Sequence, residues 1–107
     1  MERYIKLYEY EGKLTFTKEM VDSYSGQYNM ELGAYIDNNI AGVLEYVEFE
    51  KEPSISMIQI IPKYKRQGIG EALIKELAKE YPYKSIVWGI QTKEGTMLKR
   101  KMDRLLK

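Results

Sequence analysis

The residues best suited to chemistry lie in one stretch, which reads Ile58-Gln59-Ile60-Ile61-Pro62-Lys63-Tyr64-Lys65-Arg66-Gln67-Gly68-Ile69-Gly70-Glu71-Ala72-Leu73. It joins an apolar run to a basic loop with two glycines and then to an amphipathic pattern. The first turn of a helix has N–H groups without partners and partial positive charge. Glycines let a phosphate approach those groups. We therefore predict a strand, a phosphate-binding loop and a helix, with Lys63, Lys65 and Arg66 as nearby cations.

Composition limits what the remaining residues can supply. The chain has 107 residues, for which we expect one domain, 1–107. It contains no cysteine and no histidine, so we expect no thiolate nucleophile, no histidine base and no metal site. No apolar run approaches the length of a membrane span, and the N-terminus does not resemble a signal peptide. We expect a cytoplasmic protein that does not bind membranes.

The net charge of +1 hides an asymmetry along the chain. Residues 1–61 carry 5 basic and 11 acidic side chains, whereas residues 62–107 carry 12 basic and 5 acidic ones. The C-terminal part therefore suits an anion such as a phosphate, and the N-terminal part suits a cation such as an amine. Scattered solvated charge is the alternative explanation.

The segment Lys65-Arg66-Gln67-Gly68-Ile69-Gly70, preceded by Ile60-Ile61-Pro62, resembles the acyl-CoA signature of GNAT N-acetyltransferases, Gln/Arg-x-x-Gly-x-Gly/Ala. Lys65 stands where the family has Gln or Arg. The resemblance implies that the loop amides bind the pyrophosphate of acetyl-CoA. The implied cosubstrate-binding residues are Gln59, Ile60, Ile61, Lys65, Arg66, Gln67, Gly68, Ile69, Gly70 and Glu71. A Rossmann or Walker loop fits poorly, because the required third glycine or Gly-Lys-Ser/Thr is absent. A tight turn before an ordinary helix remains the alternative.

Side-chain periodicity predicts the elements that precede the loop. Residues 3–10 alternate with period two and predict a strand, which residues 14–17 continue in extended form. Residues 18–24 predict a short helix capped by Thr17, and residues 25–29 predict irregular structure.

A hairpin is expected next. Its strands span residues 32–36 and 40–49, on either side of Asp37-Asn38-Asn39, whose residue types tolerate tight turns. Residues 51–53 predict a second turn, and residues 54–61 predict the strand that leads into the phosphate loop.

Helical spacing begins after the loop. Residues 68–81 predict an amphipathic helix ended by Pro82. Residues 85–90 predict a buried strand, and Thr92 is expected to cap a last helix over residues 93–106.

This order of elements resembles the GNAT core. It implies an α+β, three-layer fold with a mixed central sheet of about five strands flanked by helices, lacking the usual last two strands. The strand at residues 85–90 would then have an exposed edge, and exposed edges pair with other chains. We expect a homodimer through this edge, or an element that covers it.

Acetyl transfer needs a positioned thioester, a stabilised oxyanion and groups that move protons. The resemblance implies that the backbone around residues 59–61 does the first two tasks, with help from a bulge. Many relatives place a Glu near the start of this strand. That position falls near Ser54, with Glu52 close by and Glu45 as a substitute base. Lys99 stands where relatives carry a proton-donating Tyr on the last helix, and Tyr28 and Tyr35 are further candidates for that role.

The leading hypothesis is therefore an acetyl-CoA-dependent N-acetyltransferase that acts by direct transfer. Its acceptor would be an amine, on a small molecule or a protein. The alternative is a non-catalytic GNAT-fold module that binds CoA or a protein partner. A nucleic-acid binder that uses the basic C-terminal residues is a third hypothesis, but no DNA or RNA motif supports it.

Overall fold

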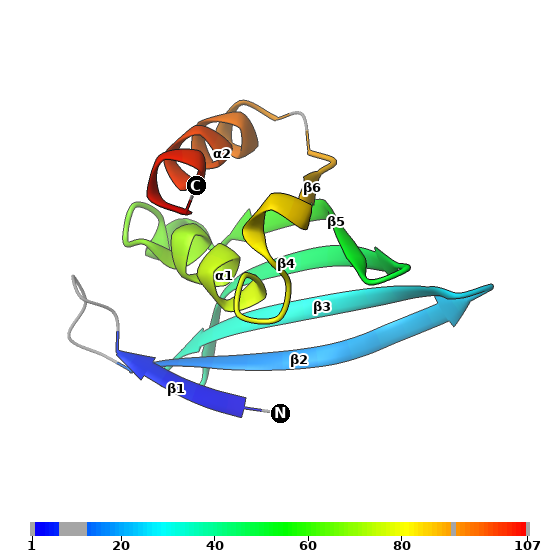
Figure 1. Cartoon of the computed structure of the whole chain (residues 1–107). Coiled ribbons are helices and arrows are strands. Elements are labelled where there is room, and N and C mark those ends of the chain that lie inside the picture. Colours follow the sequence, from blue (N-terminus) through cyan, green and yellow to red (C-terminus); the bar gives the residue numbers. More distant parts are fainter. Residues whose placement is uncertain (1, 7–12, 91, 107) are drawn as a thin grey trace.

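The computed structural model describes residues 2–6, 13–90 and 92–106, as a sheet with two helices (Figure 1). The elements are β1 (Glu2–Lys6), β2 (Lys13–Tyr24), β3 (Gln27–Ile36), β4 (Asn39–Phe49), β5 (Glu52–Ile60), α1 (Ile69–Leu77), β6 (Val87–Trp88) and α2 (Lys93–Leu106). The strand predicted over residues 3–10 corresponds to β1, and its second half lies outside the described residues. The predicted α+β class is confirmed.

The sheet is mixed, and its strands follow the order of the chain, β1-β2-β3-β4-β5-β6. Neighbours from β1 to β5 are antiparallel, whereas β6 runs parallel to β5. The parallel pair requires a crossover connection, and α1 lies in it. The predicted mixed sheet is thus confirmed, with six strands in place of about five.

Three two-residue turns connect β2 to β5. They are Ser25–Gly26, Asp37–Asn38 and Glu50–Lys51, and both residues of each turn have positive φ. Turns of this kind match the right-handed twist of the strands that they join. The predicted hairpin around residues 37–39 is confirmed, and the second turn begins before the predicted residues 51–53.

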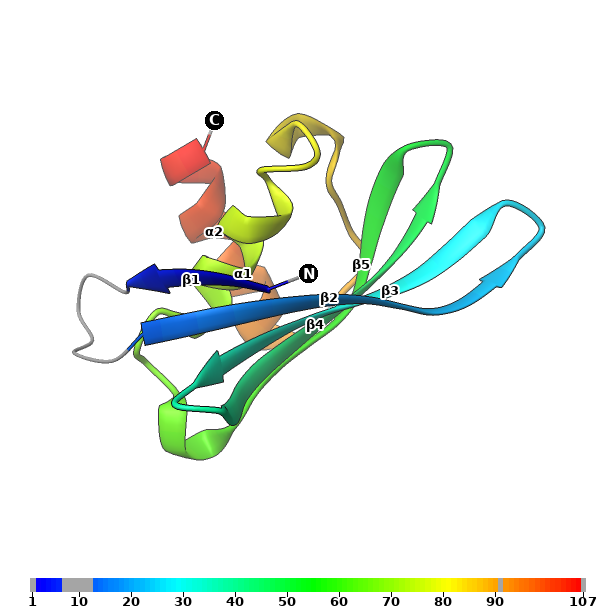
Figure 2. The ribbon, with the colours of Figure 1, turned by 90° about the horizontal axis from the view of Figure 1, so that it is seen from below.

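The prediction of a short helix at residues 18–24 and of irregular structure at residues 25–29 is wrong. These residues form the outer half of the β2–β3 hairpin, which extends beyond the helices (Figure 2). Met20 pairs with Met30 and Tyr24 pairs with Gln27, so cross-strand pairing overrides the weak helical preference. The Ser25–Gly26 dipeptide was the available signal, because such pairs favour tight hairpin turns.

Both helices lie on the same side of the sheet (Figures 1 and 2), so the described chain has two layers and not the expected three. α1 contacts β3, β4 and β5, and α2 packs against α1. Gly42 allows the close approach of α1, because a Cβ there would lie 2.9 Å from Ile60 Cδ1 and from Ile69 Cγ2. No described helix has both the length and the apolar character needed to span a membrane.

The C-terminal elements are shorter than predicted, except for the last helix. α1 ends at Leu77 and not at Tyr81, because the N–H groups of Lys79 and Glu80 turn to carbonyls three residues earlier. Pro82 therefore does not end the helix directly. The strand predicted over residues 85–90 is reduced to β6, since the backbone of Ser85 bonds back to Pro82 in a 3₁₀ turn.

The predicted last helix is confirmed as α2. The Thr92 hydroxyl accepts a hydrogen bond from the Gly95 N–H over 3.0 Å, as expected of a cap.

Strand β6 forms an edge of the sheet. It pairs with β5 on one side and with no described strand on the other side. A homodimer through this edge stays a prediction.

The packing of α2 predicts a sharp contrast between two methionines on one helix. Met102 is fully buried, whereas Met97 is 60 % exposed. We expect Met102→Ala to lower the free energy of unfolding by about 2–5 kcal/mol, because it leaves a cavity. Met97→Ala should change it by less than about 0.5 kcal/mol. Urea denaturation of both variants checks this, and equal stabilities would show that α2 does not pack as described.

Candidate functional site

The loop between β5 and α1 presents bare backbone at the start of a helix. The 3₁₀ turn Pro62–Tyr64 follows β5, and the chain then passes through Arg66 and Gly68, whose φ angles are 64° and 80°. Gly68 is the N-cap of α1, and no side chain from the described residues caps it. A Cβ at Gly68 would meet no atom within 4 Å. The space in front of the helix is therefore open.

The backbone N–H groups of residues 66–70 form no hydrogen bond with the part of the chain that the structure describes. A helix start leaves such groups without partners and adds partial positive charge. The side chains of Lys65 and Arg66 are exposed beside them. Consecutive N–H groups with adjacent cations suit an anion with several oxygens, such as a diphosphate.

Lys63, Gly70 and Glu71 lie near this loop, but they take part in contacts within the protein. The Lys63 ammonium lies over the ring of Tyr64, 5.4 Å from its centroid. A Cβ at Gly70 would lie 3.3 Å from Leu98, so this glycine also allows α1 and α2 to pack. The buried carboxylate of Glu71 forms ion pairs with Lys75 and Lys101. The Glu71 side chain thus joins the two helices and does not face the loop.

β5 contains a bulge in its middle. Glu45 pairs with Met57 and Tyr46 pairs with Ile55, so Ser56 has no partner on β4. The Ser56 hydroxyl donates a hydrogen bond to the backbone oxygen of Glu45 over 3.2 Å. Bulges of this kind redirect backbone groups and often lie next to active sites. The resemblance placed the bulge around residues 59–61, and this position is wrong, because the register shift between β4 and β5 falls at Ser56.

The pairing between β5 and β6 ends beside this bulge. β6 pairs only with Ser54 and Ile55, and the Gly89 N–H donates to the Ile55 oxygen over 2.9 Å. Further along β5, the Ile61 N–H bonds to Ala41 on β4. Hydrogen-bonding directions alternate along a strand, so the N–H groups of Ile58 and Ile60 point away from β4. From Met57 to Ile60, β5 therefore has a free edge, in that no described strand pairs with it on this side, and an extended ligand can pair there.

A family model described as the acetyltransferase (GNAT) domain matches residues 5–90, a range that includes β5, the loop and α1. The chain belongs to the GNAT acetyltransferase family. No curated protein and no solved structure matches the chain. The family predicted from the loop is thus confirmed, and it indicates acyl or acetyl transfer as the general chemistry.

In this GNAT chain, the candidate proton-handling residues fall into two groups. Glu52 and Ser54 lie near the start of β5, and Glu45 lies on β4 opposite Met57. From the alternation of side chains along the paired strands, these three residues share the face of the sheet opposite α1. The structure thus places the three residues on one face of the sheet, with Glu45 beside the bulge and Glu52 four positions further along the paired strands.

Lys99 belongs to a separate cluster on α2. Its ammonium forms an ion pair with Asp103 over 3.0 Å, and Asp103 also accepts a hydrogen bond from the Tyr83 hydroxyl over 2.7 Å. The other tyrosine candidates lie elsewhere. Tyr28 is exposed on the β2–β3 hairpin, and the ring of Tyr35 lies over Gly33. Neither the sequence nor the resemblance pointed to Tyr83.

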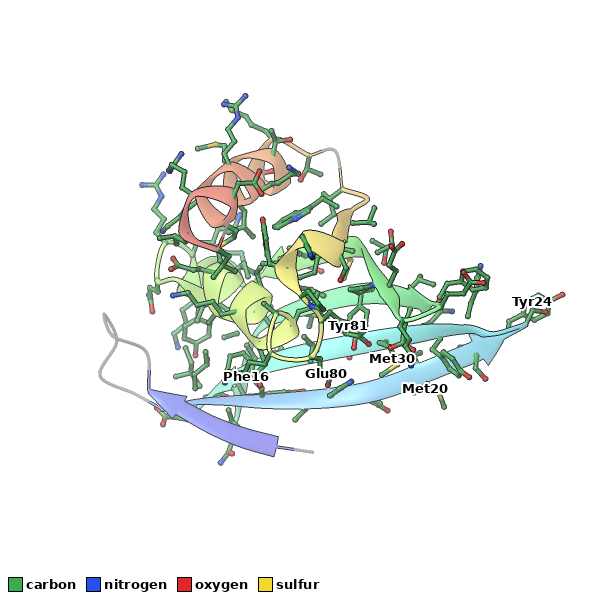
Figure 3. The ribbon with its side chains drawn as sticks, viewed as in Figure 1. Phe16, Met20, Tyr24, Met30, Glu80 and Tyr81 are labelled. Carbon is green, nitrogen blue, oxygen red and sulfur yellow. The ribbon has the colours of Figure 1, made fainter. Side chains whose placement is uncertain are left out.

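A cavity of about 150 Å³ lies at the opposite end of α1 from the loop. It is lined by Phe16, Thr17, Lys18, Leu32, Tyr46, Glu76, Leu77 and Glu80. Figure 3 shows Phe16 and Glu80 on the two sides of this region. Lys18 forms an ion pair with Glu80. Because this cavity is remote from the loop, we assign it no part in binding the acyl donor.

Three tyrosines hold their protons tightly, namely Tyr46, which lines this cavity, Tyr81, whose ring packs against Tyr46, and Tyr83, which bonds to Asp103 on α2. Burial raises the pKa of Tyr46 and of Tyr81, and the hydrogen bond from Tyr81 to Glu48 raises the pKa of Tyr81 further. Burial and the bond to Asp103 raise the pKa of Tyr83 in the same way. Burial opposes the charged form of Lys18, but the partner Glu80 outweighs burial and the pKa of Lys18 is raised.

These raised pKa values predict that the fold weakens at alkaline pH. Unfolded tyrosines ionise near pH 10, whereas the folded phenols keep their protons. Above that pH the unfolded state binds fewer protons than the folded state, so stability falls as the pH rises. We expect a lower free energy of unfolding at pH 11 than at pH 8, and a smaller difference in the double variant Tyr81→Phe/Tyr83→Phe. Urea titrations at both pH values test this, and equal losses in variant and parent would exclude these phenols as the cause.

Proposed function

We propose that this GNAT chain is an acetyl-CoA-dependent N-acetyltransferase of the cytoplasm, which moves an acetyl group directly to an amine. The observation that carries the proposal is the row of unbonded N–H groups at residues 66–70, next to the free edge of β5. A diphosphate needs the first feature, and an extended amide-containing arm can pair with the second. Both features occur on consecutive segments of one chain, as a single elongated cosubstrate requires.

The backbone would do most of the positioning. The N–H groups of residues 66–70, with Lys65 and Arg66, would hold the pyrophosphate of the cosubstrate. Residues 57–60 would pair with its extended arm, which places the thioester near the Ser56 bulge. Backbone N–H groups turned out by a bulge are suited to stabilise the developing oxyanion. Fixing donor and acceptor in this geometry lowers the entropic part of the barrier.

Proton transfer would fall to residues near the start of β5 and on β4, and to Lys99 on α2. The acceptor ammonium must lose a proton before its nitrogen forms the new bond to the acetyl carbon. Glu52 or Glu45 would take that proton, directly or through water held by Ser54. As the carbon–sulfur bond breaks, the thiolate must gain a proton, and Lys99 is the proposed donor.

A GNAT module that binds CoA without catalysis is the second candidate. It is favoured by the state of Lys99, which stands where relatives carry a tyrosine and is already paired with Asp103. In this candidate the loop and the edge of β5 keep their binding role, and only the proton-handling steps are lost. Binding and turnover must therefore be measured separately.

Two substitutions of Gly68 test the binding proposal. Asn and Asp tolerate positive φ better than other residues and have nearly the same size. Gly68→Asp places a negative charge where the pyrophosphate would lie, whereas Gly68→Asn does not. We expect Gly68→Asp to bind acetyl-CoA at least about tenfold more weakly than Gly68→Asn, as measured by calorimetry. A repulsion of about 1.4 kcal/mol between the Asp carboxylate and the pyrophosphate is enough to cause a tenfold loss of affinity. Equal affinities would contradict a phosphate site at Gly68.

Thiol release with a panel of amines separates the two candidates. If the chain is a transferase, acetyl-CoA and an amine release free thiol, and Glu52→Gln or Lys99→Gln lowers kcat. General acid–base groups contribute about 10²–10⁴-fold to such reactions. Lys84→Gln, an exposed site outside the described features, serves as the control. If the chain binds acetyl-CoA but releases no thiol with any amine, the result would contradict the transferase and support the non-catalytic CoA-binding module.

A further inference from the structure

One face of the sheet is covered by no described helix. In the part of β2, β3 and β4 that lies under α1, the buried side chains face α1 and less buried ones face away, whereas residues 19–29 of the outer hairpin are exposed on both faces. The side chains on the face away from α1 form a surface that we call the open face. Its described members on β2 to β5 include Thr17, Glu19, Asp22, Tyr24, Glu31, Tyr35, Val43, Glu45, Val47, Phe49, Glu52, Ser54, Met57 and Gln59.

The open face has an apolar component that a free sheet surface does not require. Val43, Val47 and Met57 are partly exposed there. Tyr24 and Phe49 are 77 % and 46 % exposed, near the outer end of the hairpins, where Figure 3 shows Tyr24. Exposed apolar surface rimmed by polar groups is typical of protein interaction sites, and aromatic residues are enriched in them.

The charge of the open face selects the partner. Glu19 lies directly opposite Glu31, and Glu31 lies directly opposite Glu45, so three carboxylates form a row across three strands. Like charges in such positions destabilise a sheet. None of the three forms an ion pair with a described residue. No lysine or arginine whose side chain the structure describes lies on this face of β2 to β5.

We infer that the open face docks a basic, lysine-bearing polypeptide segment. Resting on the proposed function, we further infer that this segment carries the acceptor amine. Positive side chains of the segment would neutralise the row of carboxylates, and its apolar side chains would cover Val47 and Phe49. A small amine is the less suitable partner, because small ligands bind in concave sites that enclose most of their surface. The open face is a sheet surface, and the described cavity lies on the other side of the sheet.

The position of the row connects the docked segment to the reaction. Glu45 ends the row on β4, opposite Met57 and beside the Ser56 bulge. Glu52 and Ser54 lie on the same face, one strand away. A lysine of a segment that crosses Glu19, Glu31 and Glu45 would therefore end next to Glu45, one of the proposed bases, and next to the proposed thioester position.

The test is binding of a labelled octalysine peptide, measured by fluorescence anisotropy without acetyl-CoA. We expect the double variant Glu19→Gln/Glu31→Gln to lose at least about fivefold in affinity at low salt. The matched control, Asp37→Asn/Glu94→Gln, removes two exposed carboxylates elsewhere and should bind like the parent chain. The first variant should also be at least as stable as the parent, because it relieves like-charge repulsion. Unchanged affinity, or equal losses in both variants, would overturn the docking surface.

A second measurement tests the acceptor role. The kcat/KM for octalysine should fall in Glu19→Gln/Glu31→Gln, while the kcat/KM for a small amine such as lysine amide stays unchanged. Equal effects on both acceptors would overturn the inference and leave the transferase intact. If acetyl-CoA fails to bind while octalysine binding still depends on Glu19 and Glu31, the proposed function and the acceptor role fail, and the docking surface is supported.

Discussion

The close contact between α1 and the sheet at Gly42 is the constraint on which the site depends. Any side chain at this position would collide with Ile60 at the end of β5 and with Ile69 at the start of α1. The absence of a side chain lets the first turn of α1 sit directly on β4 and β5. The loop between them is thereby held next to the free edge of β5. The loop that we propose to bind the pyrophosphate and the edge that we propose to pair with the cosubstrate arm thus become parts of one elongated surface.

The strand β5 has a different neighbour along each part of its length. Its first residues pair with both β4 and β6, its middle contains the Ser56 bulge, and its last residues pair with β4 alone. This change follows from the shortness of β6, whose flanking backbone is used in a 3₁₀ turn on one side and in a single bond to Ile55 on the other. A longer β6 would pair with the edge that we assign to the cosubstrate.

The basic residues of the C-terminal half and the acidic residues of the N-terminal half make different contacts in the fold. Several lysines of the C-terminal half are paired with acids of the same half, and Glu71 receives two of them in the contact between α1 and α2. Such partly buried pairs contribute little net stability but specify how the helices align. Lys65 and Arg66 stay exposed at the loop. Glu19, Glu31 and Glu45 of the N-terminal half are instead displayed on the open face, where none of the three forms an ion pair with a described residue.

The sequence by itself determined the family, the loop between β5 and α1, the hairpin at residues 37–39 and the last helix. Each depends on a local signal: two glycines after an apolar strand, turn-forming residues, or a capping threonine before helical spacing. The tertiary structure decided what depends on pairing between distant segments. It turned residues 18–29 into a hairpin, because residues 27–32 of β3 offered backbone partners to residues 18–24. It also placed the bulge at Ser56 and aligned Glu19, Glu31 and Glu45. A register between strands is set by the whole sheet, and no local pattern in these residues specifies it.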